Sequence, residues 1–361
     1  MNNNYYVDIH ILQTVPPCCV NRDDTNSPKT AMYGGVTRSR VSSQSWKHAM
    51  REYFKSEFTE DELGKRTKYL LDLLVNEIIK RQPELTFEKV EKKAKKILKD
   101  AGIPVDDKKK VSDTLTFISN GQIKALADCY FEENNSDAKK IKEDLKTALQ
   151  QNPSVDMALF GRMIASDPSL NYDAAAQVAH AISTHEVHTE FDYFTAVDDC
   201  SPKDNTGAGH LGTVEFNSST LYRYASVNVK ELVKNLKDDT PDVVEKFVKA
   251  FVLSMPTGKQ NTFANRTVPD LVYVTIRSDQ PVNLCGAFEN AVKAGKDGYV
   301  KKSEEALLAY ANMIYSDFVD EPKKTYFVGG EDLNVEKTSL KNLLADLKED
   351  IVEFVNETEV E

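Results

Sequence analysis

Residues 5–14 read YYVDIHILQT and residues 42–58 read SSQSWKHAMREYFKSEF, and these two stretches decide the fold at the start of the chain. The first stretch is rich in β-branched and aromatic residues and partly alternates, which predicts a buried strand. The second is expected to form a helix from about Ser43 to Phe58. The chain therefore begins with a strand, a long loop and a helix.

The loop and helix start, residues 21–51, contain the groups needed to hold a phosphate backbone. The cations of this segment are Arg22, Lys29, Arg38, Arg40, Lys47 and Arg51. Lys47 and Arg51 are four residues apart, so they share one helix face. Ser42 and its neighbouring serines supply hydroxyl groups where free backbone N–H groups and the helix dipole favour an anion. We therefore predict an anion site at this helix start.

This local basicity is not a by-product of composition, because the chain as a whole is acidic. Its 361 residues carry a formal net charge of −11, which argues against nucleic-acid binding over the whole surface. Residues 1–55 nevertheless contain seven Lys or Arg against four Asp or Glu, whereas residues 331–361 contain three against ten. Basic charge is concentrated near the N-terminus.

The sequence predicts a soluble, cytoplasmic protein. The first residues lack the charged and apolar regions of a secretory signal, and no apolar run reaches transmembrane length. The five cysteines are scattered without a CxxC pair, which indicates free thiols in a reducing compartment.

Beyond the first helix, residues 60–152 are rich in Lys and Glu and predict a helical insertion. Residues 154–163 favour a strand, residues 174–187 a helix, and the Asp-, Gly- and Asn-rich stretch 192–212 a protruding loop. Further strands are expected at 213–229, 271–276 and 325–328, and further helices at 241–254, 285–294, 302–318 and 337–355.

Without the insertion, this order is compatible with a ferredoxin-like core, the architecture of RNA-recognition modules. The aromatic RNA-stacking signature of that module is absent, so any RNA contacts are expected to come from loops.

No motif in the sequence demands an enzyme. Asp23 and Asp24 could hold a divalent metal for phosphodiester cleavage, but loop carboxylates that bond the backbone are the favoured interpretation. His180, His185 and His188 do not form a zinc motif, so capping or core hydrogen bonds are favoured there. No Ser, Cys or Thr lies in a nucleophile motif. We expect no cofactor and no catalytic residue.

Two apolar features suit a binding protein instead. Phe194 lies in the predicted loop, and Met163 follows Arg162. Exposed aromatic and thioether groups can wedge between bases. The alternative, that Phe194 is a core residue of a folded-back hairpin, is given equal weight to an exposed position that contacts a base.

Several longer motifs together resemble the CasC family, the backbone subunit of the type I-E CRISPR Cascade complex. In order along the chain they are VNRDD (20–24), YGG (33–35), RSRVSSQSWKHAMR (38–51), ALFGRM (158–163), AHAISTHEV (179–187), FTAVDD (194–199) and HLGTVEFNSSTLYRYA (210–225). The resemblance spans residues 5 to about 300.

The resemblance implies that copies of the chain stack head-to-tail along one guide RNA, or crRNA. It places Arg22, Lys29, Lys47, Arg51, Ser42 and Gln44 on the sugar-phosphate backbone of the guide, assisted by Arg38 and Arg40. It places Phe194 and Met163 on either side of a displaced base. Other Cascade subunits and target DNA, which pairs with the guide, are the further partners, and no membrane is involved.

In this family the fold is α+β, with an RRM-like (ferredoxin-like) palm, a large helical insertion and a protruding thumb loop. The corresponding segments are 1–58 for the first part of the palm, 59–152 for the helical finger insertion, 153–191 for the return to the palm, 192–212 for the thumb loop, 213–330 for the remaining palm and 331–361 for an acidic C-terminal helix.

The leading function is a non-catalytic guide-RNA-binding backbone subunit in antiviral defence. One alternative is a metal-dependent RNA-cleaving subunit that uses Asp23 or Asp24. Another is a structural scaffold that contacts no nucleic acid.

Overall fold

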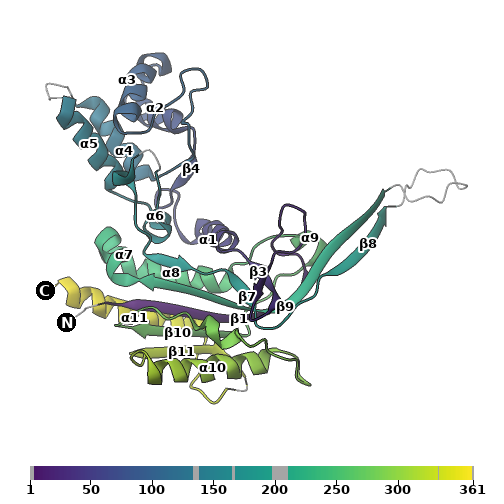
Figure 1. The fold of residues 1–361 in the computed structure, drawn as a ribbon. Coiled ribbons are helices and arrows are strands. Elements are labelled where there is room, and N and C mark those ends of the chain that lie inside the picture. The colour runs from purple at the N-terminus through teal and green to yellow at the C-terminus, as the bar shows by residue number, and fades with distance from the viewer. Residues whose placement is uncertain (1–3, 133–137, 165–166, 197–209, 332, 360–361) are drawn as a thin grey trace, which may run out of the picture. The chain divides into compact units, whose positions relative to one another are not determined.

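A computed structural model describes residues 4–132, 138–164, 167–196, 210–331 and 333–359 (Figure 1). The chain divides into two compact units. The first unit comprises residues 1–53, 178–227 and 244–353, and the second comprises residues 54–177, 228–243 and 354–361.

The first unit is built on a sheet that has nine strands within the described residues. Seven of them follow the order β11-β10-β1-β9-β7-β3-β2, and β6 and β8 both pair with β9. Their bounds are Tyr6–Cys18 (β1), Thr30–Tyr33 (β2), Val36–Val41 (β3), Ala176–Val178 (β6), Ala181–Ser183 (β7), Glu190–Ala196 (β8), His210–Asn228 (β9), Leu271–Arg277 (β10) and Lys324–Gly329 (β11). The pairs β1–β10, β10–β11, β2–β3, β3–β7, β7–β9 and β8–β9 are antiparallel.

Strand β1 is central because both of its faces are covered. Val7, Ile9 and Ile11 are buried on one face, and His10 and Leu12 are buried on the other. Successive side chains of a strand point to opposite faces, so the run of eight buried or half-buried residues from Tyr6 to Gln13 requires a layer on each side of the sheet. Because both faces of β1 are buried, apolar residues occur on both, and the sequence alternates only in part.

Helices form those two layers. The helices and 3₁₀ segments of the first unit are Ser43–Glu57 (α1), Thr240–Leu253 (α8), Gln260–Phe263 (α9), Leu284–Phe288 (η3), Val300–Asp317 (α10) and Leu340–Glu359 (α11), of which α1, α8 and α11 each continue into the second unit. Helix α10 lies along β10 and β11 (Figure 1), and its Leu307 shares a core cluster with Tyr222 of β9. The next residue, Arg223, points to the opposite face, where its guanidinium stacks on Trp46 of α1 and Phe251 of α8.

The second unit is mainly helical. Its elements are Lys65–Thr67 (β4), Leu70–Arg81 (α2), Phe87–Asp100 (α3), Thr116–Ile118 (β5), Asn120–Phe131 (α4), Ala138–Gln150 (α5), Val155–Phe160 (α6), Pro168–Leu170 (η1), Val229–Leu236 (α7) and Lys237–Asp239 (η2). Leu74, Val90, Leu126 and Leu149 bring α2, α3, α4 and α5 into one core. The Lys- and Glu-rich composition of this region is explained by the outward faces of these amphipathic helices.

The α+β fold class is confirmed, since a largely antiparallel sheet is combined with separate helical layers. The RRM-like arrangement of the palm stays a prediction. No helix among the described residues is both long and apolar enough to cross a membrane.

The predicted helix at 174–187 is wrong, because this stretch contains the short strands β6 and β7. The N–H of Ala179 donates to the carbonyl of Tyr224 (2.9 Å), and that of Thr184 donates to Thr220 (2.9 Å). The local alanines favour a helix, but pairing with β9 overrides that preference.

The element types predicted for two other stretches also differ from the structure. Residues 190–196 and the start of β9 form a paired hairpin where a loop was predicted for 192–212, and residues 197–209 lie outside the described part of the chain. Residues 155–160 form α6 where a strand was favoured. Residues 154–177 belong to the second unit, whereas the sequence predicted a return to the palm at 153–191. They are held there because Asp156 accepts from the N–H of Gly64 (2.8 Å).

Candidate nucleic-acid interface

The basic segment is organised around the start of α1. Ser42 is the residue before the helix, and its Oγ accepts from the N–H of Ser45 (3.3 Å), which satisfies one of the orphan donors of the first turn. The N–H of Ser42 donates to the side-chain oxygen of Asn21 (2.9 Å). The backbone carbonyl of Asn21 accepts from the N–H of Lys29 (2.9 Å). Asn21 thus joins the loop, the β2–β3 ribbon and the helix start in one surface.

Two cations lie directly opposite each other where this ribbon begins. The N–H of Arg40 donates to the carbonyl of Lys29 (2.9 Å), which continues the β2–β3 register by one pair. Directly opposite residues share a face, and like charges in that position are destabilising. Among the described residues, neither side chain forms an ion pair with a carboxylate. An anion between them would remove the repulsion.

The remaining candidates lie on the loop and on α1. Arg22 is exposed, and its guanidinium donates to Asn26 (3.3 Å). Gln44 is exposed in the first turn of the helix, and Lys47 and Arg51 are half-buried. We refer to Arg22, Lys29, Arg40, Gln44, Lys47 and Arg51 as the basic surface. All of its members belong to the first unit.

Arg38 does not belong to this surface, which corrects the prediction that it assists in backbone binding. Its side chain is fully buried, and its guanidinium donates to the carbonyls of Tyr33 (3.2 Å), Ser183 (3.0 Å) and Phe288 (2.8 Å). Burial lowers the pKa of this guanidinium. Since its donors are used in the interior, Arg38 holds the ribbon against β7 and η3.

The β8–β9 hairpin carries the exposed aromatic groups and extends away from the rest of the sheet (Figure 1). Phe194 is 40% exposed and lies opposite Gly212, where an added Cβ would come within 2.4 Å of its ring. Phe191, Tyr193 and Leu211 are exposed as well. Sequence reasoning missed Phe191 and Leu211, although the alternation in EFDYFTA was a strand signal that would have placed Phe191 and Tyr193 on one face.

Met163 is 84% exposed and belongs to the second unit, whereas Phe194 belongs to the first. The preceding residue, Arg162, is buried. It donates to the carbonyls of Leu149 (2.8 Å) and Leu170 (2.7 Å), and burial lowers its pKa to about 10. Arg162 therefore fixes the backbone from which the Met163 side chain projects.

The acidic pair is held by local bonds. Oδ1 of Asp23 accepts from the N–H (2.9 Å) and hydroxyl (2.7 Å) of Thr25 and from the N–H of Ser27 (3.0 Å). These bonds, chiefly that from the Thr25 hydroxyl, lower the pKa of the carboxyl group. Asp24 is exposed. Across the described ranges, no three His, Cys, Asp or Glu side chains are grouped so that they could hold a metal ion.

The three histidines have separate environments. His185 is buried and stacks on Tyr299 with ring centroids 3.6 Å apart, while its Nε2 accepts from the N–H of Thr220 (3.1 Å). His188 is exposed, 3.9 Å from a carboxylate oxygen of Glu186. Nδ1 of His180 lies 3.2 Å from the guanidinium of Arg40.

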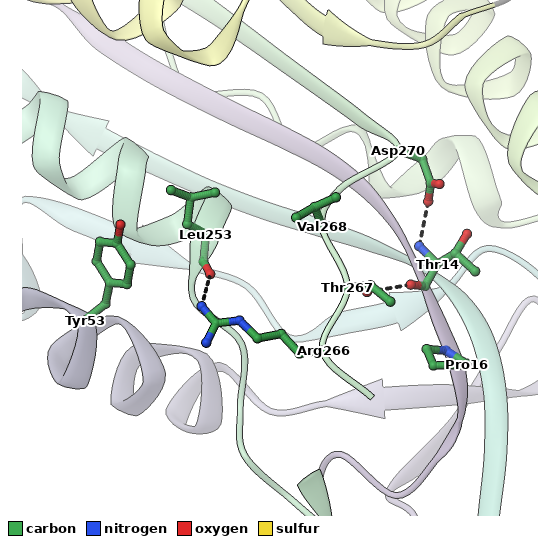
Figure 2. Close-up of a pocket in the computed structure, with 8 residues that line it drawn as sticks. All are labelled: Thr14, Pro16, Tyr53, Leu253, Arg266, Thr267, Val268 and Asp270. Carbon is green, nitrogen blue, oxygen red and sulfur yellow. Dashed lines mark hydrogen bonds between the residues drawn. The ribbon is translucent and has the colours of Figure 1, made fainter. Parts of the chain in front are cut away.

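A cleft of about 750 Å³ lies elsewhere in the first unit (Figure 2). It is lined by Thr14, Pro16, Tyr53, Leu253, Arg266, Thr267, Val268 and Asp270. Figure 2 shows that Asp270 accepts from the N–H of Thr14 (2.6 Å) and that Arg266 donates to the carbonyl of Leu253 (3.3 Å). These two charged groups therefore bond the backbone, and the residues that line the cleft form no nucleophile–base pair of the kind that covalent catalysis requires.

Comparison with known proteins identifies close structural relatives. A model of the CT1975-like protein family matches residues 7–356. A solved structure described as a CRISPR RNA-guided surveillance complex, pre-nicking, contains a chain that is 31% identical, with a TM-score of 0.79 over 95% of this chain and 100% of that one. A second CRISPR RNA-guided surveillance complex contains a chain that is 30% identical, with a TM-score of 0.60 over 94% and 99%. No curated protein matches.

The resemblance to the CasC family is thereby confirmed at the level of the Cascade backbone subunit. The assignment to type I-E stays a prediction.

Proposed function

The chain belongs to the CT1975-like protein family, and from this premise we propose that it is a guide-RNA-binding backbone subunit of a Cascade complex. The observation that carries the proposal is the 31% identity to a chain of an RNA-guided surveillance complex over nearly the whole length of both chains. The finer assignment that we propose is a cytoplasmic, type I-E complex active in antiviral defence.

The basic surface supplies the phosphate contacts in this proposal. Its cations surround a helix start, and both side chains and backbone N–H groups in such a position favour an anion. These contacts carry no sequence information, so the protein positions the guide and base pairing reads the target DNA. Ser42 contributes by capping the helix, and Arg38 by fixing the ribbon that presents Arg40.

The exposed apolar residues supply the base contacts. We propose that Phe194 on the hairpin and Met163 on the second unit flank a displaced base, which leaves the intervening bases ordered for pairing. Copies of the chain would stack head-to-tail along the crRNA through a heterologous contact, with other Cascade subunits at the ends.

We propose that the subunit is not itself a nuclease. Each of the three bonds to Oδ1 of Asp23 is a local loop bond, and such a carboxylate is less available to a metal. Incubation of the assembled complex with complementary RNA and magnesium tests this. Uncleaved RNA is the expected result, and regularly spaced cleavage that Asp23→Ala or Asp24→Ala abolishes would establish the RNA-cleaving alternative.

The decisive experiment on RNA binding compares two double variants. Lys47→Ala with Arg51→Ala removes two cations of the basic surface, and Lys108→Ala with Lys109→Ala removes two exposed lysines of the second unit. Each protein is co-expressed with the complex, and the RNA that copurifies is quantified after thermal denaturation has confirmed folding. We expect RNA to be lost only from the first variant. Equal RNA in both would show that the basic surface does not hold the guide.

A further inference from the structure

His180 is the one histidine of the three that lies against the basic surface. It lies just before β7, diagonally across from Arg40 in the β3–β7 register. Residues in that relation share a face of the sheet. Lys29, Arg40 and His180 therefore occupy one face, contributed by three separate segments of the chain.

The hydrogen bond between His180 and Arg40 defines the state of the imidazole. A guanidinium can only donate, so Nδ1 of His180, 3.2 Å from Nη1 of Arg40, must accept. In the neutral ring the proton is then on Nε2, which is a donor. The side chain is exposed, so this donor is accessible to a ligand.

Within the part of the chain that the structure describes, the charges that act on His180 are positive. Partial desolvation beside the sheet lowers the pKa of the imidazole, and so do Arg40 of β3 and Lys29 before β2, which are the charged groups that act on it. No carboxylate of the described residues pairs with Arg40 or Lys29 at this point. A bound anion would supply the missing negative charge and would favour the protonated ring, in which Nδ1 also carries a proton and no longer accepts from Arg40.

We propose that Lys29, Arg40 and His180 together form one phosphate site, in which His180 donates to a phosphodiester oxygen of the guide RNA. This inference rests on the proposed function and deepens it. Binding of RNA and protonation of His180 are then linked, so each favours the other. The affinity for guide RNA increases as the pH falls through the range in which histidine titrates.

The test uses the full-length chain, freed of RNA, and a labelled single-stranded RNA whose binding is followed by fluorescence anisotropy at constant ionic strength. His180→Gln keeps a hydrogen-bonding side chain but cannot become charged. We expect this variant to bind about tenfold more weakly than the unmodified chain near pH 6 and about twofold more weakly near pH 7.5. His188→Gln, an exposed histidine eight residues away, is the matched control and should bind as the unmodified chain does.

A second measurement follows the titration of the histidines by NMR, with the His180 signal assigned from the His180→Gln spectrum. Its pKa should rise when RNA is added. An unchanged pKa, together with equal affinity of His180→Gln and the unmodified chain at both pH values, would overturn the site while leaving RNA binding by the rest of the basic surface intact. Failure of the unmodified chain to bind RNA at either pH would instead overturn both this inference and the proposed function.

Discussion

Arg38 and Arg40 lie two residues apart on β3, yet one belongs to the interior of the first unit and the other to its basic surface. Arg38 is covered by β7 and η3 and donates to three carbonyls. Arg40 lies beside Lys29 and His180 and pairs with no carboxylate of the described residues. Both positions point to the same face of the strand. What the chain packs over each residue therefore decides its role, and spacing along the sequence does not.

The same contrast holds for groups that titrate. In the interior, His10 and Asp8 are buried on β1 and bonded to tyrosines: Nδ1 of His10 lies 2.9 Å from the hydroxyl of Tyr222, and Tyr224 donates to Asp8 (2.9 Å). Burial opposes charge on both groups. On the basic surface, Lys29 and Arg40 form no ion pair with a carboxylate of the described residues. Burial thus disfavours charge on His10 and Asp8, whereas Lys29 and Arg40 are placed to bind an anion.

The strongest test of this contrast replaces the two arginines separately. Arg38→Ala leaves several buried carbonyls without donors, so we expect the free energy of unfolding to fall by about 3 kcal/mol. Arg40→Ala should change it by no more than about 0.5 kcal/mol. Urea denaturation of both variants gives the comparison, and equal losses of stability would remove the distinction between interior and surface.

The pH dependence of stability tests how burial acts on His10 and Asp8. His10 has its pKa lowered to about 3, mainly by burial, so stability is lost as the pH falls from 6.5. Asp8 has its pKa raised to about 6, also by burial, so stability is lost as the pH rises from 3.8. Between these limits the two effects oppose each other.

Asp8→Asn removes one side of that balance. We expect the variant to lose about 1.4 kcal/mol of stability per pH unit between about pH 6 and pH 4 relative to the unmodified chain, because only His10 then responds. Urea midpoints at several pH values measure the slope. Parallel profiles for the two proteins would mean that burial does not raise the pKa of Asp8.

Salt dependence examines the surface side of the comparison. If Arg40 contacts a phosphate, Arg40→Ala should reduce the slope of log affinity against log salt concentration by about 0.7, the increment for one contact with single-stranded nucleic acid. Lys108→Ala provides a control with the same change in net charge. Identical slopes for all three proteins would exclude Arg40 from the phosphate contacts.

A small effect on stability is also expected at the hairpin. Phe194→Ala should cost less than about 1 kcal/mol, since the ring is partly exposed on a two-stranded extension. Gly212→Ala should displace the ring, because its Cβ would lie 2.4 Å from it. Both variants should melt near the unmodified chain but assemble poorly with guide RNA. Loss of folding in Phe194→Ala would show that the ring belongs to the core.

Features with a strong local signal could be predicted from the sequence. The strand at β1, the helix at α1 and the helical region of α2 to α5 follow from periodicity and composition. The strands at 174–187 could not be predicted in this way, because their extended form depends on pairing with β9, which lies more than thirty residues later. Alanine-rich sequence indicates a helix until that partner is present.

The types of residue in the candidate site could be predicted from the sequence, but their burial and contacts could not. The cations of residues 21–51 were identified by type and spacing, but the burial of Arg38 depends on carbonyls of Ser183 and Phe288, far along the chain. For the same reason His180 could be weighed from the sequence only as part of a possible metal site with its neighbours His185 and His188. Its contact with Arg40 exists only once β3 and β7 are paired.

The buried arginines have one more consequence, which concerns the electric field of the first unit. Arg38 and Arg223 donate to carbonyl and amide oxygens, and neither has an ion-pair partner among the described residues. Dipoles solvate such a charge without cancelling it, and salt ions cannot approach it in the interior, so it is screened less than a surface charge. Two permanent positive charges thus lie in the unit that carries the basic surface. A polyanion approaching from solution experiences their attraction even though the chain as a whole has a net charge of −11.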